Sequence, residues 1–232
     1  MRSPFPLFGA LFGLSLLMLP SPASSGKGKR LLLPDLVPAE GTGGRMFVEE
    51  LGSQKLLRFD AYFANVGDGP LTLTGRAKKA KKRLPAWQSV RRLGKKPPFK
   101  HPIGEFTWQP ERVKWSLFPV AEYRLRNEGG QVAAQTKISF CMVDNVRVAP
   151  DLPGSPTAGV YVTCPATSRR KSIQIGVSVG WADIYKAEHL GQWIDVTDVP
   201  PGDYTLEVEI DPEGRLLEKD RSNNRVTLPV TL

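Results

Sequence analysis

The stretch "GQWIDVTDVPPGDYTLEVEIDP" (residues 191–212) determines the fold class. It contains the turn sequence "PPGD", followed by apolar side chains at every second position from Tyr204 to Ile210, the pattern of a half-buried β-strand. Strands are also expected over Trp193–Val196 and Arg225–Thr231. This patterning is typical of sheets packed face to face. We predict an all-β chain: a single β-sandwich-like domain over residues 26–232, with long loops and little helix.

The sequence upstream has a similar character. Residues 55–75, "KLLRFDAYFANVGDGPLTLTG", predict a hairpin, because two β-rich runs flank the turn "NVGDGP". The 232 residues include 22 glycines and 21 prolines, and strong helical periodicity is absent from the sequence. The residues after the first 25 suffice for one sizeable core but are few for two domains.

The first 25 residues have the layout of a secretory signal peptide. Arg2 precedes the apolar stretch "PLFGALFGLSLLMLP", and small residues follow at "SPASS", so cleavage is expected after Ala23 or Ser25. The apolar run is short for a membrane span. We therefore expect a secreted or periplasmic protein with no membrane span after cleavage.

The net charge of +9 comes from one segment. Residues 76–100 hold eleven Lys and Arg and no acid, which leaves a net charge of −2 for the rest of the chain. Such a run predicts a mobile, solvated basic loop. The alternative is an arm that binds an anionic polymer or an envelope surface. Trp87 and Phe99 are its interleaved aromatic residues, few for a nucleic-acid platform. The candidate anion-binding residues are Lys78, Lys79, Lys81, Lys82 and Arg83.

The chain has two cysteines, Cys141 and Cys164. In an exported chain an even pair predicts one disulfide, which would stabilise the fold by roughly 3 kcal/mol in the loop-entropy model. Two buried free thiols, or a metal site, are the competing interpretations.

Residues 108–117, "WQPERVKWSL", raise a question about their polar face. From residue 112 onward apolar and polar residues alternate as in a half-buried strand. Two cations next to each other on one face repel and do not favour strand pairing. We expect Val113, Trp115 and Leu117 to face one way, and Arg112, Lys114 and Ser116 the other.

Several stretches in order resemble one family. "QTKISFC", "GWADIYKAEHLGQWIDVTDVPPGDYTLEVEIDP" and "EKDRSNNRV" are similar to the catalytic domain of lysyl oxidases, as are "LPDLVP" and the 55–75 stretch. The resemblance runs from about Leu33 to Val230. It implies a secreted copper amine oxidase that oxidises the ε-amine of peptidyl lysine to an aldehyde, releasing ammonia and hydrogen peroxide.

The resemblance also implies a quinone cofactor, lysine tyrosylquinone, formed from a lysine and a tyrosine of the chain when copper is bound. "KISFC" places Lys137 at the lysine position, and "ADIYK" ahead of "GQWID" places Tyr185 at the tyrosine position. The alternative is that both residues are unmodified. Tyr185 would then fill space beside Trp181 and Trp193, and Lys137 would pair with an acid such as Asp183.

The copper ligands of the family lie in a run like "HPEHxHWH", where this chain has "QPERVKWS". Arginine stays protonated and an ammonium has no lone pair, so neither ligates a metal in these forms. The histidines of the sequence, His101 and His189, lie outside this run, and we expect no cofactor. The histidine positions are taken by Gln109, Arg112, Lys114 and Ser116.

Three functions are compatible with these residues. The first is a non-catalytic exported domain, derived from lysyl oxidases, that binds a partner or surface. The second is a working amine oxidase on peptidyl lysine, with copper held by other ligands. The third is a sheet module of an envelope assembly with no pocket. The missing histidines favour the first.

Overall fold

The computed structural model describes residues 30–232 except 95, 111–112, 118 and 140. The described part contains no α-helix, and its strands pair antiparallel in four sheets, so the all-β prediction is confirmed. The expected signal peptide at residues 1–25 lies outside the described residues, and so does Arg112. No helix in the described part is long and apolar enough to cross a membrane.

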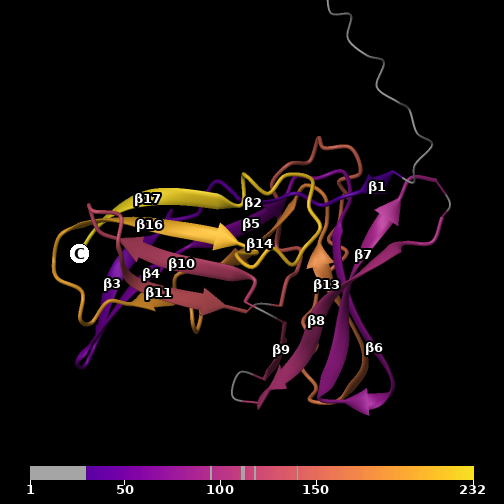
Figure 1. Cartoon of the computed structure of the whole chain (residues 1–232), viewed down its shortest axis with the longest axis horizontal. Coiled ribbons are helices and arrows are strands. Elements are labelled where there is room, and N and C mark those ends of the chain that lie inside the picture. The colour runs from indigo at the N-terminus through magenta and orange to yellow at the C-terminus, as the bar shows by residue number, and fades with distance from the viewer. Residues whose placement is uncertain (1–29, 95, 111–112, 118, 140) are drawn as a thin grey trace, which may run out of the picture.

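The largest sheet forms one side of the molecule (Figure 1) and runs in the order β13-β6-β7-β8-β9, with β1 added to β7. Its strands are β1 (Leu31–Leu32), β6 (Leu71–Lys81), β7 (Arg83–Arg92), β8 (Phe99–Gln109), β9 (Lys114–Ser116) and β13 (Arg170–Val177). The sheet holds together because inward positions of β6 and β7, such as Leu73, Leu84 and Ala86, are fully buried, while the charged positions between them face solvent.

Three further sheets form the other side of the molecule (Figure 1). One contains β10 (Ala121–Arg126), β11 (Val132–Ile138), β16 (Asp203–Ile210) and β17 (Arg225–Thr231). The second contains β2 (Leu36–Pro38), β5 (Ala61–Asn65), β12 (Val146–Arg147) and β14 (Trp181–Tyr185). The third contains β3 (Met46–Leu51), β4 (Gln54–Phe59) and β15 (Trp193–Asp195).

The core lies between these sheets. Tyr123 of β10 packs edge-on against Phe59 of β4, with ring centroids 4.8 Å apart. Both side chains are fully buried, as are Leu206 and Val208 on the inward face of β16. The alternation from Tyr204 to Ile210 therefore marks the inward face of a real strand, although Tyr204 at its start is only partly buried.

The predicted hairpin over residues 55–75 is wrong. β4, β5 and β6 follow one another in the chain but belong to three different sheets. The turn after β5 is held by Asn65, whose side-chain oxygen accepts from the Asp35 and Gly67 amides and whose amide nitrogen donates to Val177 O at 2.9 Å. At Gly67 an added Cβ would lie 2.5 Å from backbone atoms of the 33–35 segment. The turn thus redirects the chain from one sheet to the next.

Two other local predictions are corrected. Residues 76–100 are not a loop: β6, β7 and the start of β8 account for most of them, joined in one antiparallel arrangement. In the 108–117 stretch β8 ends at Gln109, and the next strand begins only at Lys114, because Val113 adopts φ +50° and is exposed. Trp115 and Ser116 are both buried, so this short strand has no solvent face beyond its first residue.

Candidate functional site

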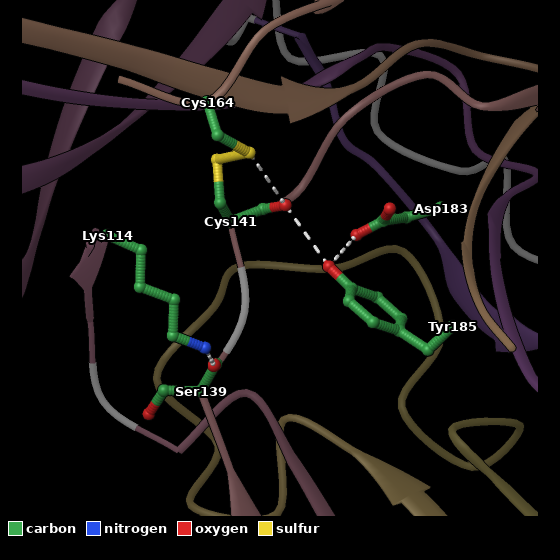
Figure 2. Close-up of a disulfide and its surroundings, with 6 residues drawn as sticks. All are labelled: Lys114, Ser139, Cys141, Cys164, Asp183 and Tyr185. Carbon is green, nitrogen blue, oxygen red and sulfur yellow. Dashed lines mark hydrogen bonds between the residues drawn. A yellow bond between two sulfur atoms is a disulfide. The ribbon is translucent and has the colours of Figure 1, made fainter. Parts of the chain in front are cut away.

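Two of the residues singled out in the sequence, Lys114 and Tyr185, lie near a disulfide (Figure 2). Cys141 and Cys164 are bonded, with Cα atoms 5.9 Å apart, as predicted. The backbone oxygen of Cys141 lies 3.1 Å from the hydroxyl of Tyr185, which is also 2.5 Å from Asp183 Oδ2. Cys141 follows β11, Cys164 precedes β13, and Asp183 and Tyr185 share β14, so three separate stretches meet here.

Asp183 is the unusual titrating group of this cluster. Burial raises the pKa of its carboxyl to about 8, helped by the charge of Asp144, against the opposing hydrogen bonds from Tyr185 and from the Val143 and Ile184 amides. The Tyr185 hydroxyl is the donor at this site: it donates to Asp183 Oδ2 and also lies within hydrogen-bond distance of Cys141 O.

Tyr185 is partly buried and packs against the core. Burial, followed by the neighbouring Asp183, raises the pKa of its phenol well above the usual value. Its ring packs against Phe63, at 6.4 Å between centroids, and against His189, at 6.2 Å. Of its two expected tryptophan neighbours, Trp181 donates from its indole nitrogen to Pro156 O, and Trp193 lies under the guanidinium of Arg58.

Lys137 lies in a different environment. It is exposed on β11, with Glu122 of β10 directly opposite in the strand register. Asp183, the acid suggested as its partner, instead contacts Tyr185 from inside the fold. In the described part of the chain no hydrogen bond or ion pair joins Lys137 to Tyr185. The sequence placed both at quinone-precursor positions, and the structure puts them on different sheets.

Lys114 turns inward toward the disulfide segment. Its ammonium donates to the backbone oxygen of Ser139 at 2.8 Å, two residues before Cys141 (Figure 2). Gln109 is opposite Lys114 in the β8–β9 register. Ser116 is 2% exposed, and its hydroxyl has no hydrogen-bond partner among the described atoms. Three of the four residues expected at ligand positions, Gln109, Lys114 and Ser116, therefore lie on one short strand pair.

These residues do not fit a copper site. An ammonium that donates to a carbonyl presents protons where a metal requires a lone pair. His101 Nε2 lies within hydrogen-bond distance of Arg215 O, and His189 Nδ1 accepts from the Lys186 amide. The two imidazoles therefore contact different segments of the chain. Within residues 30–232, as far as they are described, no three His, Cys, Asp or Glu side chains form a metal-binding group.

The positive charge of the molecule gathers elsewhere, in a groove of about 1310 Å³ on the large sheet. Among the candidates chosen from the sequence, Lys78 lines this groove, whereas Arg83 forms an ion pair with Glu105 at 2.6 Å. Lys79, Lys81 and Lys82 are exposed and do not line it. Sequence reasoning missed the contribution of β13, because Arg170 and Lys171 lie far from the basic segment in the chain.

A family model for lysyl oxidase matches residues 101–232, more than half of the chain. The chain belongs to the lysyl oxidase family. The matched region contains both cysteines, Lys137, Tyr185 and the strand with Lys114. The whole basic segment, residues 76–100, precedes it.

Curated relatives agree with this assignment. Over 115 residues the chain is 51% identical to lysyl oxidase homolog 2 of Gallus gallus, covering 47% of this chain and 13% of the relative. It is 31% identical over 137 residues to lysyl oxidase homolog 4 of Mus musculus, covering 55% and 16%. It is 38% identical over 96 residues to protein-lysine 6-oxidase of Gallus gallus, covering 41% and 20%. The chain thus matches a fifth or less of each relative's length.

Proposed function

We propose that this chain is an exported, non-catalytic lysyl oxidase-like domain that acts as a binding module. The observation that carries the proposal is the hydrogen bond from Lys114 Nζ to Ser139 O. At a position where the family has a copper-binding imidazole, this chain has a cation that bonds to its own backbone. The cation fastens β9 to the segment before the disulfide and leaves no lone pair for a metal there.

The positions of the two quinone-precursor residues support the same conclusion. A covalent link between a lysine and a tyrosine requires their side chains to meet. Lys137 is exposed opposite Glu122, whereas the Tyr185 hydroxyl is engaged by Asp183 and by the Cys141 backbone. Both residues have structural roles that need no modification, Lys137 as a surface cation of its sheet and Tyr185 as a hydrogen-bonded part of the core.

The alternative is a copper- and quinone-dependent amine oxidase that acts on peptidyl lysine. It is favoured by the presence of both Lys137 and Tyr185 and by the likeness to a protein named protein-lysine 6-oxidase. Such an enzyme would need copper ligands other than the residues of β9.

One purification distinguishes the two. The wild-type chain is expressed with its leader and with copper supplied, and the exported protein is examined by elemental analysis, quinone redox staining and a peroxide-coupled amine assay. We expect an N-terminus after Ala23 or Ser25, no stoichiometric copper, no quinone and no peroxide. One copper per chain together with a positive quinone stain would refute the proposal.

A variant with histidine at all four matching ligand positions provides the matched comparison. If the backbone there still has the spacing of a metal site, Gln109→His, Arg112→His, Lys114→His and Ser116→His together should bind copper where the wild type does not. This control shows that the elemental analysis can detect a site at this place in the fold.

A further inference from the structure

The groove on the large sheet collects cations from three strands that are distant in sequence. Arg76 and Lys78 come from β6, Lys100 from β8, and Arg170 and Lys171 from β13. The strand order β13-β6-β7-β8 brings them to one surface, because outward positions of neighbouring strands lie side by side. Figure 1 shows these strands together on the side of the molecule away from β16 and β17.

The charges in this groove are unbalanced. No carboxylate is among its described lining residues, and in the part of the chain that is described none of the five cations forms an ion pair. Elsewhere on the surface the cations are often paired: Arg126 and Arg225 with Glu207, and Lys219 with Asp68. Cations concentrated without counter-charge weaken the fold by repulsion, so an anion is the ligand that this surface favours.

The floor and walls of the groove carry groups suited to sugars. Thr74 and Gln174 are opposite each other in the β6–β13 register, and Lys100 Nζ lies 3.2 Å from the Thr74 hydroxyl. Trp87, opposite Thr74 on the other side, is 39% exposed. Hydroxyl and amide groups bond to sugar hydroxyls, and an exposed indole offers an apolar face to a sugar ring. A single aromatic residue is too few for the successive base stacking of a nucleic-acid platform.

We propose that this groove binds an acidic polysaccharide, with the five cations contacting its carboxylate or sulfate groups and Trp87 contacting a sugar ring. The inference rests on the binding part of the proposed function. It is not implied by the family, because Arg76, Lys78, Trp87 and Lys100 all precede residue 101, where the family match begins.

The test uses two variants of equal charge. Lys78→Gln/Lys171→Gln removes two exposed cations from the groove, and Lys79→Gln/Lys82→Gln removes two exposed cations that do not line it. Binding to alginate and heparin oligosaccharides is measured by titration calorimetry at several salt concentrations, with oligo-dT of matched length for comparison. Alginate reports on carboxylates and heparin on sulfates.

We expect the wild type to bind at least one of the two sugars, with affinity falling as salt rises. The groove variant should bind about tenfold more weakly, since two charge contacts are lost, while the control variant changes by less than about twofold. Trp87→Ala should weaken sugar binding without changing its salt dependence. The proposal is overturned by no binding, by equal losses in the two charge variants, by an unchanged Trp87→Ala variant, or by oligo-dT binding as tightly as the sugars. If copper, quinone and peroxide are also absent, such a result overturns the polysaccharide proposal and leaves the non-catalytic assignment standing.

Discussion

Replacing Asp183 by asparagine should flatten the pH dependence of the free energy of unfolding. In the folded protein burial raises the pKa of this carboxyl to about 8, from a reference value of 3.8. Between these values the unfolded chain has released the proton and the folded chain retains it. The unfolded state then binds fewer protons, so the stability falls as the pH rises.

The size of the effect follows from the separation of the two pKa values. One proton difference changes the free energy of unfolding by up to about 1.4 kcal/mol per pH unit, which amounts to roughly 6 kcal/mol across the interval. The full stabilisation is present at the acid end, and the loss levels off once the pH exceeds the folded pKa. The amide introduced by Asp183→Asn keeps an oxygen that accepts from the Tyr185 hydroxyl but has no proton to lose in this range.

The assay is urea denaturation followed by tryptophan fluorescence, at unit pH steps from about 4 to about 9. Glu218 must be allowed for, because burial raises the pKa of its carboxyl to about 7 and gives a slope of the same sign. Since Glu218 is present in both proteins, the difference between wild type and Asp183→Asn isolates Asp183. That difference should grow with pH in favour of the variant until about pH 8. Parallel stability curves would show that Asp183 is ionised in the folded protein and would refute the reasoning.

Two further predictions concern stability. Cys141→Ser/Cys164→Ser should lower the free energy of unfolding by about 3 kcal/mol, because the cross-link closes a loop with a sequence separation of 23; an unchanged midpoint in urea would contradict it. Arg124→Gln should cost about 3 kcal/mol near neutral pH, since it leaves the buried Glu122 and Glu207 without the guanidinium that pairs with both. Burial opposes ionisation of Glu207, but Arg126 and Arg124 outweigh it and lower the pKa of this carboxyl. The cost should therefore shrink in acid as Glu207 is protonated, and a constant cost would count against the prediction.

The C-terminal strands could be predicted from the sequence because one face of their sheet is buried. Their residues therefore alternate between apolar and polar side chains. The strands expected over Tyr204–Ile210 and Arg225–Thr231 are observed as β16 and β17, with one residue added to β16. The disulfide was also predicted, since two cysteines allow one pairing. For the strands the deciding information was local in the sequence. For the cysteines only one pairing existed.

The basic segment was misjudged because its composition favoured a loop. Lysine-rich and proline-containing runs are usually solvated, yet in β6 and β7 the charged residues lie outward and small or apolar residues lie inward. A signal was present in the alternation of Leu84, Ala86 and Val90, which are all buried. The failed hairpin has another cause: β5 and β6 each pair with strands far away in sequence, and such pairing depends on the tertiary fold.

Lys114 and Tyr185 have a structural connection to the groove. Lys114 donates to Ser139 O, and the Tyr185 hydroxyl lies against Cys141 O, so both side chains act on the backbone next to one half of the disulfide. The other half, Cys164, lines the wall of the groove. The disulfide therefore links the backbone that Lys114 and Tyr185 contact to the wall of the groove. The contacts of Tyr185 with Asp183 and with the Cys141 backbone thus give this tyrosine a structural role that does not depend on copper, as the proposed binding module requires.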